Sequence, residues 1–241
     1  EVVDASRRTI VGSGEVLVAR EPFKVFVWTD RGHYRVGDTI HAHFQARTLD
    51  GKGVTGEGKM KLLRITYDAD EQPVENVAQE WALNPNDEGY AEFDIKASEP
   101  GQYRLSYAVT TQPAADGGDQ PSSIVHRLSS IEGGYLFVIR GDGFDGSEFQ
   151  FNDLELVLDR TEYAPGNKVQ LLVNTNRVGS SVLLFLRPVN GLYAGRPQLL
   201  RLDGKSTTVE IGVAQKDMPN FFVEAVTVSG GKVHTVMREV I

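Results

Sequence analysis

Two histidines on one strand-like segment come nearest to a metal-binding arrangement in this sequence. His41 and His43 alternate along the chain, so both imidazoles lie on one face, as zinc ligands must. The same face continues with Gln45, and the sequence indicates no third ligand. We therefore interpret the pair as polar side chains on a solvated strand face, with metal binding as the less favoured alternative.

Acidic side chains gather in the segment GDGFDGSEFQFND, residues 141–153. Carboxylate oxygens are calcium ligands, but their spacing here differs from the EF-hand loop, whose acids alternate and end in a glutamate at position twelve. A flexible acidic linker explains the segment better, so we predict no metal. The candidate ligands for the calcium alternative are Asp142, Asp145, Glu148 and Asp153.

Catalytic motifs are the next feature to consider. Serine, histidine and aspartate all occur, but no G-x-S-x-G elbow does, and an all-β pattern provides no strand-turn-helix context for such a nucleophile or for a nucleotide phosphate. No acid, base and nucleophile converge in the sequence. We predict that the chain is not an enzyme, has no catalytic residues and needs no cofactor.

Composition indicates a globular protein of two domains. The chain has 241 residues, 40% of them hydrophobic and 24% charged, which suffices for two buried cores. A net charge of -8 argues against general binding to nucleic acid, and no apolar run reaches the roughly 18 residues of a membrane span. The absence of cysteine excludes disulfides and thiolate chemistry from these residues.

Strand-length alternation separated by Gly, Pro, Asn and Asp predicts an all-β protein. Each half of the chain offers about seven strands, so we expect two consecutive seven-stranded, antiparallel, immunoglobulin-like β-sandwiches. The expected boundaries are 21–141 for the first domain, 142–152 for a linker and 153–241 for the second domain. Residues 1–20 contain no signal peptide pattern, and we interpret them as an N-terminal segment that could end a preceding domain.

A repeated motif marks the start of both halves. TDRGHYRVGDTI at 29–40 and LDRTEYAPGNKV at 158–169 share Asp, Arg, Tyr and Gly in register. Pro165 and Gly166 predict a type II turn with positive φ at the glycine, and Gly37 takes the same place in the first copy. Tyr34 and Tyr163 are expected to cap the core with their hydroxyls at its edge.

A second pair of turns supports the repeat. Pro100-Gly101 and Pro219-Asn220 both predict a turn with positive φ at the residue after proline. Tyr103, two residues after Gly101, resembles the tyrosine corner of sandwich folds. The repeats thus share turns and strand starts rather than reactive groups.

Side chains outside these turns have simpler expected places. Arg31, His33 and Arg35 are expected at the surface, and Trp28 and Trp81 in the core. The polar segment TTQPAADGGDQPSS, residues 110–123, is interpreted as an exposed connection, with a protease-sensitive loop as the alternative.

Taken together, DRGHYRVGDTI, DGKGV, NDEGYAEF, PGQYRLSY and PNFF occur in an order that resembles the macroglobulin-like domains of bacterial alpha-2-macroglobulins. The resemblance covers roughly residues 20–241. It implies macroglobulin-like β-sandwiches, the second next to the bait region, in a secreted or periplasmic inhibitor of endopeptidases. The family often carries a thioester in a Cys-x-Glu-Gln motif, which this sequence lacks.

The resemblance therefore implies a non-catalytic scaffold that positions a bait region and relays its cleavage. Its partners would be proteases, bound through the parent protein, and neighbouring macroglobulin-like domains, with no nucleic acid. Two alternatives remain: repeat modules of a bacterial surface adhesin or stalk, and a carbohydrate-binding accessory domain. The last requires exposed aromatic residues, and the candidates are Trp28, Tyr67, Trp81 and Tyr193.

Overall fold

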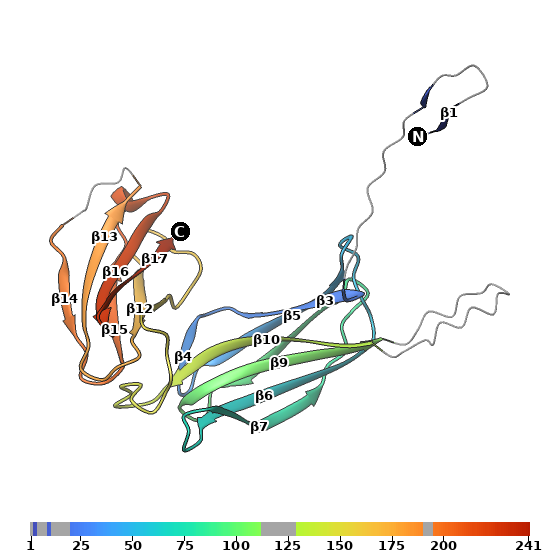
Figure 1. Ribbon diagram of the computed structural model, residues 1–241, viewed down its shortest axis with the longest axis horizontal. Coiled ribbons are helices and arrows are strands. Elements are labelled where there is room, and N and C mark those ends of the chain that lie inside the picture. Colours follow the sequence, from blue (N-terminus) through green and yellow to red (C-terminus); the bar gives the residue numbers. More distant parts are fainter. Residues whose placement is uncertain (1, 4–8, 11–19, 112–128, 190–194) are drawn as a thin grey trace.

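Two β-sandwiches follow one another along the chain in the computed structural model (Figure 1). The structure describes residues 2–3, 9–10, 20–111, 129–189 and 195–241. β1 (Val2–Val3) and β2 (Thr9–Ile10) form a small antiparallel pair ahead of the first sandwich. The expectation for residues 1–20, and residues 112–123 of the predicted loop at 110–123, otherwise lie outside the described residues.

The N-terminal sandwich packs a five-stranded sheet, in the order β4-β10-β9-β6-β7, against a three-stranded sheet, in the order β3-β5-β8. Its strands are β3 (Phe23–Thr29), β4 (His33–Arg35), β5 (Thr39–Thr48), β6 (Glu57–Tyr67), β7 (Pro73–Ala82), β8 (Tyr90–Lys96), β9 (Gly101–Thr111) and β10 (Ser129–Arg140).

The C-terminal sandwich packs the sheet β11-β12-β15 against the sheet β14-β13-β16-β17. Its only described helix is the 3-10 turn η1 (Gln215–Asp217), which precedes β16. Its strands are β11 (Glu155–Val157), β12 (Lys168–Asn174), β13 (Ser181–Pro188), β14 (Gln198–Arg201), β15 (Ser206–Gly212), β16 (Phe221–Ser229) and β17 (Lys232–Val240).

Period-two alternation explains how each sandwich forms its core. Along β5, Ile40 and Phe44 are fully buried, whereas His41 and His43 point away from the core. Val169 and Leu171 of β12 are likewise fully buried in the other sandwich. Each sandwich has its own cluster of buried hydrophobic residues, so packing and β ladders stabilise both without any disulfide.

The all-β sandwich architecture is confirmed, while the strand count and the purely antiparallel pairing need correction. The described N-terminal sandwich has eight strands rather than seven, because residues 33–35 form the short strand β4. β4 runs parallel to β10, pairing Tyr34 with Ile139. The boundaries at 141 and 153 remain predictions. Among the described residues, no helix has the length and apolarity needed to cross a membrane.

Candidate functional site

The repeated motif forms the same hydrogen-bonded corner in both sandwiches. In the first, the Tyr34 hydroxyl donates to Asp30 Oδ1 at 2.6 Å and accepts from the Arg31 backbone N–H at 3.1 Å. In the second, the Tyr163 hydroxyl donates to Asp159 Oδ1 at 2.9 Å and accepts from the Arg160 N–H at 3.0 Å. Each tyrosine therefore holds the chain that leaves the preceding strand.

Each aspartate also ties its corner to the strand that follows. Asp30 Oδ1 accepts from the His41 backbone N–H at 3.0 Å, and Asp159 Oδ1 accepts from the Gln170 N–H at 2.6 Å. Burial, more than the neighbouring carboxylates, raises the pKa of Tyr34 and of Tyr163. The tyrosines thus stay neutral and donate to the carboxylates.

The turns that end the corners also match each other. Gly37 and Gly166 have φ of +97° and +91°, in the region that favours glycine. The Asp38 N–H donates to the Arg35 carbonyl at 3.0 Å, and the Asn167 N–H donates to the Ala164 carbonyl at 2.9 Å. Pro165 lies just before its glycine and outside the core, as a turn residue.

At the second pair of predicted turns the structure differs from expectation. Neither Gly101 nor Asn220 has a positive φ, because each residue begins or directly precedes a strand and is already extended. The Glu99–Pro100 peptide bond before β9 is not cis, whereas the Met218–Pro219 bond is cis. The Tyr103 hydroxyl donates to the Glu99 carbonyl at 3.2 Å, the geometry of a tyrosine corner.

The acidic segment between the sandwiches is held by local hydrogen bonds and by hydrogen bonds to the second sandwich, where the Asp145 carbonyl accepts from the Lys205 and Ser206 N–H groups. Asp145 accepts from the backbone N–H and the hydroxyl of Ser147, and Asp153 accepts from the Asn176 side chain. Within the described residues, no three His, Cys, Asp or Glu side chains are grouped to hold a metal, and this applies to Asp142 and Glu148 as well. The segment GDGFDG has the glycine spacing of a dinucleotide loop, but no helix follows it.

The two corners approach each other at the junction between the sandwiches. A Cβ built on Gly32 would lie 2.5 Å from the Leu158 carbonyl oxygen and 2.5 Å from the Val157 side chain. A real Cβ does not come so close, so only glycine permits this contact. The corner of the first sandwich thus rests on backbone of the second.

His33 is the polar link across this junction. Its Nε2–H donates to the Gln170 carbonyl at 2.9 Å, and its side chain is buried. Burial lowers the pKa of His33 to about 4, with a smaller contribution from the charge of Arg140, while the bond to Gln170 works in the opposite direction. The expectation that His33 lies exposed is therefore wrong, because the second sandwich covers it.

Arg140, the last residue of β10, makes a second link. Its guanidinium donates to the Thr208 hydroxyl of β15, while its buried Nε has no hydrogen-bond partner. Burial and the nearby charge of Arg35 lower the pKa of Arg140. Arg35 itself is exposed, and Arg31 is half-buried and pairs with Asp38 at 3.2 Å.

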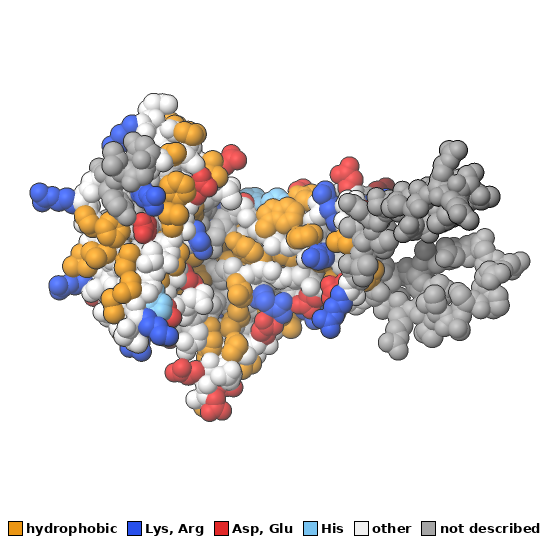
Figure 2. All heavy atoms as spheres, turned by 45° about the horizontal axis from the view of Figure 1, so that its top comes forward, with side chains coloured by type: hydrophobic (Ala, Val, Ile, Leu, Met, Phe, Trp, Pro, Cys, Tyr) orange, Lys and Arg blue, Asp and Glu red, His pale blue; other side chains and the backbone are white. Residues whose placement is uncertain are grey.

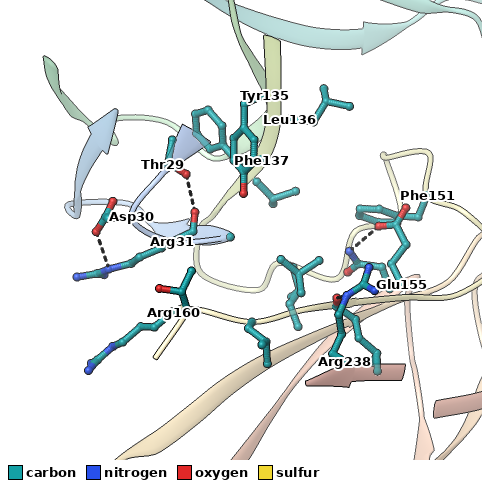
Figure 3. Close-up of a pocket in the computed structure, with 18 of the residues that line it drawn as sticks. Thr29, Asp30, Arg31, Tyr135, Leu136, Phe137, Phe151, Glu155, Arg160 and Arg238 are labelled. Carbon is teal, nitrogen blue, oxygen red and sulfur yellow. Dashed lines mark hydrogen bonds and ion pairs between the residues drawn. The ribbon is translucent and has the colours of Figure 1, made fainter. Parts of the chain in front are cut away.

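A cleft of about 560 Å³ lies beside these contacts (Figure 3). Leu136 and Phe137 line it from β10, Phe151 from the segment between the sandwiches, and Arg238 from β17 of the second sandwich. The Arg238 Nε–H donates to the Leu156 carbonyl at 3.1 Å. This hydrogen bond fixes Arg238 within the second sandwich. The cleft lies between the two sandwiches, which contact each other at the corners. Its residues do not form a nucleophile–base pair.

The sequence did not indicate this junction. Gly32 and His33 stand between matched positions of the repeat, and only their difference from Thr161 and Glu162 in the second copy was a signal. Gly32 and His33, which differ between the copies, contact the second sandwich.

Comparison with known proteins finds a similarity in the second sandwich. Residues 154–240 match the family described as the alpha-2-macroglobulin bait region domain. This part of the chain is similar to the bait region domain of alpha-2-macroglobulins. The predicted resemblance to alpha-2-macroglobulins is therefore confirmed.

Individual alpha-2-macroglobulins are similar over larger parts of the chain. A homolog from Deinococcus radiodurans is 30% identical over 136 residues, which are 54% of this chain and 12% of that protein. A Salmonella alpha-2-macroglobulin mutant is 18% identical, with a TM-score of 0.32, over 99% of this chain and 16% of its own. The E. coli alpha-2-macroglobulin in its native conformation is 17% identical, with a TM-score of 0.32, over 91% of this chain and 14% of its own. The chain thus spans a small part of these relatives.

Proposed function

We propose that the chain provides two non-catalytic scaffold modules of an alpha-2-macroglobulin-like, broad-spectrum inhibitor of endopeptidases. The match of residues 154–240 to a bait region domain carries this proposal. In such an inhibitor the second sandwich holds the bait region, and proteases and neighbouring macroglobulin-like domains are its partners. A secreted or periplasmic location follows from the same relationship.

The junction supports a role in relaying bait cleavage. Gly32 rests on the Leu158 carbonyl, and His33 bonds to the Gln170 carbonyl, so a movement of the bait region domain must either break these contacts or carry the first sandwich along. An interface that depends on specific contacts of this kind can have two arrangements. The corner motif would keep each sandwich rigid while the junction changes.

The test uses the parent inhibitor carrying Gly32→Val. The added side chain meets the Leu158 carbonyl and pushes the modules apart. We expect the protease to cleave the bait region at the normal rate, while the inhibition that follows cleavage falls severalfold. Gel electrophoresis of the cleaved chain and residual protease activity measure the two steps.

Gly212→Val is the matched control, because no atom lies within 4 Å of a Cβ at Gly212 and its φ is not positive. This variant should inhibit normally. Full inhibition by the Gly32→Val protein would contradict the relay, and loss of bait cleavage itself would contradict the division between bait and scaffold.

A further inference from the structure

An aromatic surface on the N-terminal sandwich has no role in the scaffold described above. It lies on the outer face of the sheet β3-β5-β8, where Phe26 is 50% exposed and Trp28 is 39% exposed. His43 and Tyr90 lie beside Trp28 on the same face. Figure 2 shows hydrophobic side chains next to histidine on this part of the molecule. We call Trp28, His43 and Tyr90 the aromatic platform.

The three rings of the aromatic platform pack against one another. Their centroids are 5.6 Å apart for Trp28 and His43, 6.2 Å for His43 and Tyr90, and 6.5 Å for Trp28 and Tyr90. These distances form a nearly equilateral triangle, whereas a linear stack would place Trp28 and Tyr90 about twice as far apart. The His43 plane is inclined by 20° to Trp28 and by 26° to Tyr90, and the Trp28 and Tyr90 planes are tilted by 45° to each other, so the three rings form one aromatic cluster.

A chain of hydrogen bonds fixes this arrangement. The His43 Nδ1–H donates to the Tyr90 oxygen at 2.7 Å, and the Tyr90 hydroxyl donates to Glu92 Oε2 at 3.0 Å. Burial and the bond to Glu92 raise the pKa of Tyr90, so it remains a donor. The bonded Nδ1–H leaves His43 Nε2 as an acceptor, and the second carboxylate oxygen of Glu92 also remains.

A polar hollow of about 630 Å³ adjoins the aromatic platform. Within it, His41 Nδ1 lies 2.7 Å from Asp94 Oδ1, and both side chains are largely exposed. Asp30, at the corner, and Glu92 complete its hydrogen-bonding groups. Flat apolar rings therefore border a set of carboxylate and imidazole acceptors.

We propose that the aromatic platform and the adjoining hollow bind a neutral glycan built of pyranose rings. A pyranose has a face of C–H bonds that packs on an aromatic ring, and a rim of hydroxyls that donate to carboxylates and imidazoles. Trp28 supplies the ring face, and Glu92 and Asp94 supply acceptors for neighbouring hydroxyls. The same carboxylates repel an acidic glycan.

The structure corrects the expectation for Trp28 and gives different surroundings to the aromatic residues that were candidates for carbohydrate binding. Trp28 was expected in the core but lies exposed, because it points to the outer face of an edge strand. Trp81 is half-buried against Phe93, and Tyr67 is half-buried beside Gln102. Tyr193 lies outside the described residues. The glycan surface therefore rests on Trp28, together with His43 and Tyr90, which the sequence did not single out for it.

The experiment is a fluorescence titration of the 241-residue chain carrying Trp81→Phe, which leaves Trp28 as the single tryptophan. Chitohexaose and cellohexaose are the probes. We expect at least one of them to change Trp28 emission in a saturable way. In calorimetry on the original chain, Trp28→Ala and Glu92→Gln should each weaken that binding by roughly tenfold.

Controls make the result specific to this surface. Val77→Ala shortens an exposed hydrophobic side chain on β7, which is 58% exposed against 39% for Trp28, and should leave binding unchanged. Sorbitol, which has hydroxyls but no ring, should not bind, and an oligogalacturonate should bind more weakly than the neutral probes.

Several outcomes would overturn the glycan site. They are failure of both neutral probes to bind, unchanged binding by a Trp28→Ala protein that keeps its melting temperature, and tighter binding of the oligogalacturonate. A dimer of the original chain that Trp28→Ala dissolves would also overturn it, because a second copy would then cover the surface. None of these outcomes bears on the junction, so the scaffold proposal is tested separately.

Discussion

At the scale of single residues, the aspartate–tyrosine pair explains why the motif recurs. One carboxylate oxygen of Asp159 receives both the Tyr163 hydroxyl and the Gln170 backbone N–H, and the side chain is buried. A buried carboxylate is costly unless such bonds compensate it, so neither partner can change alone. Chain reversal at the start of each sandwich therefore depends on this pair together with the glycine of the turn.

The turn glycines provide the residue-scale prediction. Replacing Gly37 or Gly166 by Val should lower the free energy of unfolding by about 1–3 kcal/mol, because a β-branched residue is strained at positive φ. No atom within 4 Å obstructs a Cβ at either position, so strain is the only cost. Chemical denaturation measures it, with Gly212→Val as the control of ordinary φ. Equal stability of the two turn variants and the control would contradict the explanation.

The sequence predicts the turn of the corner but not the contact that the corner makes with the second sandwich. Tyr163, Pro165 and Gly166 lie in a local turn whose conformation depends on near neighbours, so spacing alone predicts it. His33 and Gly32 have no such local signal. Their burial comes from the second sandwich, more than a hundred residues further along the chain. Sequence reasoning therefore placed the turn and missed the contact.

At the scale of elements, the strands were predictable and their surroundings were not. Alternation located β5 and β12 within a few residues, since one side of each strand must be buried. It could not show that the three residues of β4, within the repeated motif, pair with β10 in parallel, because such pairing depends on the course of the whole chain. It also could not distinguish a core-facing Trp28 from one on the outer face.

Strand β4 provides the prediction at this scale through His33. Its pKa is about 4 in the folded chain and 6.5 when exposed. The contribution of neutral His33 is therefore complete above pH 6.5, falls as the pH drops, and is lost below pH 4, where both states are protonated. The free energy of unfolding should decrease by roughly 3 kcal/mol over this window.

Because carboxylates also titrate here, the comparison is with His33→Gln, whose amide can still donate to the Gln170 carbonyl. Chemical denaturation at several pH values between 7 and 4 gives the difference between the two proteins. The stability of the original chain relative to the His33→Gln protein should fall by roughly 3 kcal/mol as the pH drops through this window. Two parallel curves would show that His33 does not titrate on unfolding, and the assigned burial would be wrong.

At the scale of the whole molecule, the junction joins two separately packed cores. The buried Nε of Arg140 lacks a partner, and Leu136 in the cleft is 57% exposed. An unsatisfied buried donor and an exposed apolar side chain both weaken an interface. These two features weaken the connection between the sandwiches, which supports the relay of movement proposed above.

The final prediction concerns protease inhibition by the isolated chain. Under the proposed scaffold role, the isolated 241-residue chain should not inhibit proteases, because two such modules would position a bait region but would not enclose a protease. The measurement is digestion of a large protein substrate by a broad-specificity protease, with and without a molar excess of the chain. The rate should be unchanged, and the Gly32→Val chain should behave identically. Clear inhibition by the isolated chain would contradict the scaffold role, since the inhibitory surface would then lie within these two sandwiches.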